Sequence, residues 1–227
     1  MRRREFTWLG QRFVYLNLES EPGGSLQQQS QSLFVRAGTE LAQAGLRLDR
    51  HVVRTRVFGR TREARDVISA VRGETFTGQA RAATSSYISP AHLTSGDVAL
   101  DLYAMAEPTE GVPRKVTEME PVQPFIRHLI WGPFVFHAGM TNEHVPSLVE
   151  QCAEILPRAG ERLKENGCGW QNVVRVSFFL HRSQTADALF AAARAAAPVP
   201  LDHAEIEFVD GYSRPGKLVE IEVTAKR

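Results

Sequence analysis

A group of acidic and basic side chains near the C-terminus could do chemistry. Asp202 and His203 are followed by Glu205 and Glu207, which alternate with apolar residues. Alternate side chains of a strand lie on one face, so Asp202 and His203 could form a polar substrate-binding site with Glu205 and Glu207. A polar strand face exposed to water is the alternative interpretation.

Arg214 is a second candidate, because a guanidinium donates two charge-assisted hydrogen bonds to a carboxylate and stays protonated. It lies beside Pro215 and Gly216, so an ordinary turn residue is the alternative. The histidines lack the His-x-x-x-His spacing of a metal-binding helix, and no Cys–His–Asn pattern accompanies Cys152 or Cys168. We therefore predict no metal, no cofactor and no cysteine nucleophile.

Composition narrows the class of protein. The 27 basic and 26 acidic residues among 227 give a net charge of +1, which argues against binding mainly through nucleic-acid phosphates. No stretch approaches about 18 consecutive apolar residues, and the N-terminus lacks the apolar run of a secretory signal. Two cysteines are too few for a disulfide framework. We expect a cytoplasmic protein that binds a small molecule and neither a nucleic acid nor a membrane.

An internal repeat organises the chain into two halves. Segments of the first half recur in the same order in the second, displaced by 121 positions or by one more or one fewer. The matched pairs are Val52–Phe58 with Val173–Phe179, Arg36–Gly38 with Arg158–Gly160, Phe13–Leu16 with Phe134–His137, and Val98–Leu102 with Leu218–Glu222. Chance would not supply all of these matches in order.

Each half predicts the order β–α–β–α–β–β, which is an α+β fold. The expected elements are strand 13–18, helix 26–44, strand 52–58, helix 62–71 and strands 81–88 and 98–106, then strand 134–138, helix 145–166, strand 173–179, helix 185–196 and strands 204–209 and 218–225. Pro157 should kink the third helix or mark its edge. The proline-rich stretch 107–124 suits an exposed linker. We therefore predict domains at 1–106 and 125–227.

The ordered motifs resemble the Rid (YjgF) family of imine and enamine deaminases. The resemblance depends on Val135–Gly139, on the Arg-Ala-Gly helix, on the Val-Val-Arg strand and on the terminal Leu218–Val223. It implies a tandem pair of domains, each a sheet packed on two helices, related by a pseudo-twofold within a barrel-type assembly. It also implies active sites in the clefts between domains.

The resemblance further implies roles for single residues. Arg81, at the start of the penultimate strand, would bind the substrate carboxylate, and a last-strand acid, Glu220 or Asp101, would orient the attacking water. The family's strand-end glycine matches Gly139, whereas Asp202 replaces the arginine in the second half. One cleft could then combine Arg81 of one half with Gly139 and Glu220 of the other.

We therefore expect a Rid-type hydrolase or deaminase that acts on a small carboxylated imine, enamine or related metabolite of a specialised pathway. A chorismatase-like hydrolase is one alternative, since those proteins also resemble two Rid-type domains, and Arg214–Glu222 loosely fits their arginine before an acidic last strand. A non-catalytic, ligand-binding homologue is another. The resemblance implies that three Rid-type domains pack around one barrel, and one chain supplies only two of them. We therefore expect a homo-oligomer, either a dimer or a trimer of two-domain chains.

Overall fold

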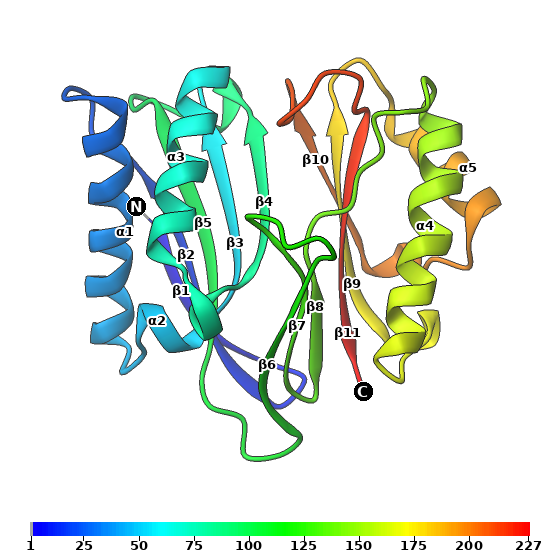
Figure 1. The fold of residues 1–227 in the computed structure, drawn as a ribbon, viewed down its shortest axis with the longest axis horizontal. Coiled ribbons are helices and arrows are strands. Elements are labelled where there is room, and N and C mark those ends of the chain that lie inside the picture. Colours follow the sequence, from blue (N-terminus) through cyan, green and yellow to red (C-terminus); the bar gives the residue numbers. More distant parts are fainter. Residues whose placement is uncertain (1) are drawn as a thin grey trace.

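Two mixed β-sheets face each other at the centre of the molecule, and helices cover their outer faces (Figure 1). The structure is a computed structural model that describes residues 2–227. The first sheet has the order β1-β2-β5-β3-β4 and the second β10-β9-β11-β8-β7-β6. The predicted α+β class and the tandem arrangement are confirmed.

The elements of the first half precede those of the second along the chain. The first half contains β1 (Arg2–Trp8), β2 (Gln11–Glu19), α1 (Leu26–Gln43), α2 (Leu48–His51), β3 (Val52–Gly59), α3 (Arg62–Thr75), β4 (Ala83–Ile88) and β5 (Val98–Met105). The second contains β6 (Val112–Glu118), β7 (Ile126–Gly132), β8 (Phe134–His137), α4 (Leu148–Glu165), β9 (Val173–His181), α5 (Ala186–Ala196), β10 (Ala204–Val209) and β11 (Val219–Lys226). Two short 3-10 helices, η2 (Pro90–His92) and η4 (Leu201–His203), flank the strands used below.

The same arrangement of four core strands occurs in each sheet. The order β2-β5-β3-β4 of the first half matches β8-β11-β9-β10 of the second, and the pairs β3–β4 and β9–β10 are parallel in both. The register makes the equivalence residue by residue. Arg56 lies opposite Asp101, and Ser177, its equivalent, lies opposite Glu222. Asp101 is thus equivalent to Glu222, while Ala99, opposite Phe58, takes the position of Glu220, opposite Phe179.

Three strands were not predicted. β1 forms a hairpin with β2, and β6 and β7 extend the second sheet beyond β8. β6 lies inside 107–124, so this stretch, expected to be an exposed linker, in fact contributes an edge strand to the second sheet. β1 and β6 are edge strands with mostly exposed or half-buried side chains, so they lack the apolar alternation that identifies a strand in a sequence.

The helices begin where the sequence supplies caps. Ser25, Thr61, Ser147 and Thr185 each accept a hydrogen bond from a backbone N–H of the first helical turn. Pro157 lies inside α4, which extends from Leu148 to Glu165 as one helix. Each helix pair buries an apolar face against the outer side of its own sheet.

The inner faces of the sheets enclose a polar layer between two apolar clusters. One cluster joins Phe13 of β2 to Phe134 and Phe136 of β8. The other joins Phe58 and Tyr87 of the first half to Phe179, Val209 and Tyr212 of the second. The domains are therefore fastened at two places, and the charged residues described below lie between them.

Among residues 2–227, no helix is both long and apolar enough to span a membrane.

Candidate functional site

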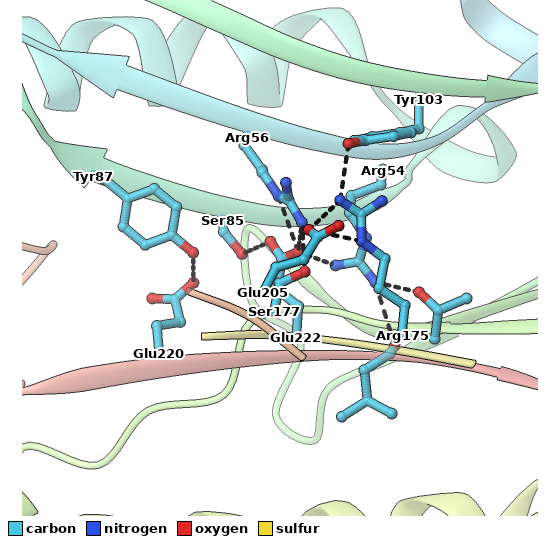
Figure 2. A network of polar contacts seen from close by, with 12 residues as sticks. Arg54, Arg56, Ser85, Tyr87, Tyr103, Arg175, Ser177, Glu205, Glu220 and Glu222 are labelled. Carbon is cyan, nitrogen blue, oxygen red and sulfur yellow. Dashed lines mark hydrogen bonds and ion pairs between the residues drawn. The ribbon is translucent and has the colours of Figure 1, made fainter. Parts of the chain in front are cut away.

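A buried ion-pair network joins the two sheets (Figure 2). Arg54 and Arg56, both on β3, point toward Glu222 of β11, and all three residues are almost fully buried. Arg54 Nη1 and Arg56 Nη2 lie 2.9 and 2.7 Å from Glu222 Oε2. Ser85 of β4 donates a 2.6 Å hydrogen bond to the other carboxylate oxygen. The network therefore links the first domain to the last strand of the second.

The charge state of Glu222 follows from these partners. Burial alone would raise the pKa of this carboxyl, but the two guanidiniums overcome burial and lower the pKa to about 2. Glu222 is thus ionised at any physiological pH. It compensates charge and does not supply a proton.

The equivalent arginine of the second domain contacts the first domain. Arg175 of β9 matches Arg54, and its Nη2 donates a 3.0 Å hydrogen bond to Tyr103 Oη on β5. Arg54 Nη2 lies 3.3 Å from Thr224 Oγ1 on β11, and Thr224 is the equivalent of Tyr103. Each domain's arginine therefore contacts the other domain's last strand. Arg175 also binds Glu205 of β10, with Nη2 to Oε2 at 2.5 Å.

A cavity of about 340 Å³ opens beside this network, between the two domains. Its floor carries Arg54, Arg175 and Tyr103, and Asp202, His203 and Glu205 lie at its exposed rim. An aromatic wall completes it, made of Phe6, Trp8, Phe13 and Phe136. The combination is typical of a small-molecule site, in which an apolar wall excludes water and a few polar groups fix orientation.

The floor of this cavity favours an anion. The guanidiniums of Arg54 and Arg175 lie on the floor, whereas the lining carboxylates, Asp202 and Glu205, lie at the exposed rim, so positive charge is gathered at the floor. Arg54 Nη1 is buried and is compensated by Glu222, whose Oε2 lies 2.9 Å away. A bound carboxylate would accept charge-assisted hydrogen bonds from the guanidiniums at the floor.

The structure brings two of the predicted site residues into contact. Gly139 follows β8, and a Cβ added there would overlap Glu220 Oε1 and Ser85 Oγ. Tyr87 Oη donates a 3.2 Å hydrogen bond to Glu220 Oε1. Burial raises the pKa of Glu220, with neighbouring Glu222 adding to the effect. Gly139 and Glu220 therefore form one buried group, close to β4 of the first domain.

Two predicted anion-binding arginines have partners elsewhere. Arg81 forms an ion pair with Glu118 of β6, and its Nη2 donates a 2.7 Å hydrogen bond to the carbonyl of Gln123. Arg214 is exposed and pairs with Glu143 at 3.0 Å. The predicted roles of both arginines remain predictions, and the cleft that would combine Arg81 with Gly139 and Glu220 is not preformed by these contacts.

Asp101 lies on the inner face of the first sheet, apart from Glu220. Its Oδ1 accepts a 2.7 Å hydrogen bond from Asn17 and lies 3.8 Å from His92 Nε2. Asp202 and His203, by contrast, lie together at the rim of the cavity, as the grouping with Glu205 predicts. Glu207, two residues further along β10, contacts His92 instead.

The floor residues of the cavity were not predicted. Arg54 and Arg175 lie in the repeated Val-Val-Arg motif, which by itself indicates only the fold. The available signal was an arginine at the same place in two otherwise buried strands, since arginine is rarely buried unless it is paired. Among the described residues, no group of three or more His, Cys, Asp or Glu side chains could hold a metal ion.

Comparisons with known proteins establish the fold. A crystal structure of chorismatase matches 97% of this chain and 78% of its own, with a TM-score of 0.65 and 15% identity. A YjgF/YER057c/UK114 family member from Mycobacterium tuberculosis matches 51% of this chain and all of its own, at TM-score 0.45 and 23% identity. A YjgF protein from Neisseria meningitidis matches 51% and 95%, at 0.41 and 20%. No family model and no curated protein matches the sequence. The predicted two-domain, Rid- and chorismatase-like resemblance is confirmed at the level of the fold.

Proposed function

We propose that this chain hydrolyses a small carboxylated metabolite in the cavity between its domains. The observation that carries the proposal is the aromatic-walled cavity, whose floor holds the guanidiniums of Arg54 and Arg175. Arg54 and Arg175 would bind the substrate carboxylate, and the wall around Trp8 and Phe136 would pack against its apolar part. The chorismatase-like fold supports a hydrolytic reaction.

The rim residues would supply the proton transfers. Asp202 and His203 lie at the open side, where water enters, and a carboxylate beside an imidazole can activate water and protonate a leaving group. The scheme suits an imine or enamine, in which protonation precedes addition of water to the carbon and release of ammonia. It equally suits an enol ether, in which protonation of carbon precedes addition of water and release of an alcohol.

The test uses two substrates to compare the cavity around Arg175 with the predicted cleft around Arg81. Native protein is assayed for ammonia release from freshly generated 2-aminoacrylate and for pyruvate release from chorismate. Arg175→Gln should lower kcat/KM about tenfold to a hundredfold, the loss expected for a charge-assisted hydrogen bond. Arg81→Ala and the exposed control Arg182→Gln should retain near-native activity.

The other outcomes are decisive as well. Loss of activity in Arg81→Ala with retention in Arg175→Gln would place the reaction in the cleft that the sequence predicts around Gly139 and Glu220. Calorimetric binding of chorismate, abolished in Arg175→Gln but without turnover, would identify a ligand-binding protein. Neither binding nor turnover would reject both probes as representatives of the substrate.

A further inference from the structure

His92 lies between two carboxylates that belong to different domains. Its Nδ1 is 3.2 Å from Glu207 Oε1 on β10, and its Nε2 is 3.8 Å from Asp101 Oδ1 on β5. The ring is stacked on Phe58 of β3, with centroids 3.7 Å apart and planes 15° apart. Asn17 of β2 approaches Nε2 at 3.4 Å. The imidazole is therefore fixed in plane and position by the first domain while one edge faces the second.

The repeat explains why a histidine is needed here. Glu222 is compensated by Arg54 and Arg56 of the other domain, and their equivalents, Arg175 and Ser177, would have to serve Asp101. Arg175 is bound to Glu205 and Tyr103, and Ser177 carries no charge. No arginine forms an ion pair with Asp101 within residues 2–227, so His92 is its cationic partner.

The strand that His92 contacts is held to the first domain at its C-terminal end, where Val209 packs against Phe58 and Tyr87 and the next residues bond to the backbone of Ile88. β10 is an edge strand that pairs only with β9 in the sheet. It begins directly after η4, so Asp202, His203 and Glu205 of the cavity rim depend on where β10 lies. Glu207 is two residues from Glu205, which binds Arg175 of its own domain, whereas Glu207 contacts His92 of the first domain.

We propose that His92 is an interdomain latch, which holds β10 and the cavity rim against the first domain by bridging Asp101 and Glu207. His92 is thus a positioning residue. The latch does not depend on the proposed function; its effect on catalysis does, because only then is the rim part of the reaction.

The latch should open at alkaline pH. Burial alone would lower the pKa of His92, but its contacts with Asp101 and Glu207 raise it to about 9. The groups that face the ring are these two carboxylates, the neutral Asn17 amide and the Phe58 ring. Because the folded-state pKa is higher than that of a free histidine, the contribution is complete below about pH 6.5 and is lost as the pH rises through about 9.

Hydrogen exchange of the β10 amides, without ligand, tests the latch. At pH 7, His92→Gln and Glu207→Gln should each accelerate exchange in β10 about tenfold relative to native protein, and the double variant should match the single ones. Glu207 is one-third exposed, so its substitution serves if His92→Gln fails to fold. Asp210→Asn, which breaks an exposed ion pair with Arg182 within the second domain, should leave β10 unchanged.

A second arm of the experiment follows, as the pH is raised, the ratio of the variant's exchange rate in β10 to the native rate. This ratio cancels the intrinsic effect of pH on exchange. The ratio should fall toward one by pH 10, where native His92 is neutral. Native-like exchange of β10 in both single variants, multiplying effects in the double variant, or a ratio independent of pH would each overturn the latch. None of these outcomes depends on whether the cavity is catalytic.

Discussion

Gly139 and Glu220 show how a single residue type can decide whether an acid is accommodated. Glu220 is buried, and its carboxylate occupies the space where any side chain at position 139 would begin. Tyr87 holds the same carboxylate from β4 of the other domain. A glycine here therefore leaves room for a buried acid at the domain junction.

Replacing this glycine should destabilise the protein. In Gly139→Ala the added methyl group overlaps Glu220 and Ser85, and overpacking of this kind costs about 1–3 kcal/mol of unfolding free energy. Urea denaturation measures the loss. Gly38→Ala is the control, because a Cβ there meets no atom within 4 Å and alanine favours the α1 helix by about 1 kcal/mol. Equal stability of Gly139→Ala and native protein would contradict the packing argument.

At the scale of single residues, the sequence predicted which site residues lie close together better than it predicted what each of them does. The grouping of Asp202 with His203 and Glu205 agrees with the cavity rim, and Gly139 lies against Glu220. The register separates Asp101 from Glu220, because the halves pair Asp101 with Arg56 and Glu220 with Phe179. Side-chain partners such as Glu118 for Arg81 arise from tertiary packing, which no local pattern encodes.

Most secondary-structure elements with a buried face were predicted; β1 and β6, which lack one, were not, and neither was β7, although it is largely buried. The long helices and the strands of the repeated four-stranded core carry apolar patterns, so they agree with expectation to within a few residues. β1 and β6 lie at sheet edges, where backbone hydrogen bonding outweighs weak side-chain patterns. The proline content of 107–124 indicated a linker, yet Pro113 is compatible with β6 because an edge strand tolerates a missing N–H.

The helix α4 lacks one backbone hydrogen bond because it contains a proline. Pro157 is exposed inside it and cannot donate the hydrogen bond to the carbonyl four residues earlier. Pro157→Ala should restore that bond and raise the unfolding free energy by about 1–3 kcal/mol, measured by urea denaturation. Glu154→Ala, an exposed change on the same helix, should stay within about 0.5 kcal/mol of native. No gain in Pro157→Ala would show that the surrounding structure has already compensated for the proline.

At the scale of the whole molecule, buried charge makes the two domains interdependent. Arg54 and Arg56 come from one domain and Glu222 from the other, so neither set is compensated without its partner. Breaking a buried pair from one side leaves an unpaired charge, which is far more costly than losing a surface pair.

Glu222→Gln should therefore be strongly destabilising. It leaves two buried guanidiniums without their carboxylate, and the expected loss is about 3–5 kcal/mol of unfolding free energy in urea denaturation at pH 7. Glu161→Gln, which removes an exposed pair with Lys164, should cost less than about 1 kcal/mol. Similar small losses in both variants would mean that the domains do not depend on this network. The predicted dimer or trimer of chains remains a prediction at this scale.

The crossed contacts of Arg54 with Thr224 and of Arg175 with Tyr103 have a consequence for how such a molecule can change over generations. In an assembly of two identical subunits, one mutation alters both sides of a symmetric interface at once. Here both sides are encoded separately, so Ser177 can stand where its counterpart is Arg56, and Asp202 where its counterpart is Arg81. Because the two halves are joined in one polypeptide, each side of the interface can mutate independently of the other. The cavity between the domains can therefore be asymmetric.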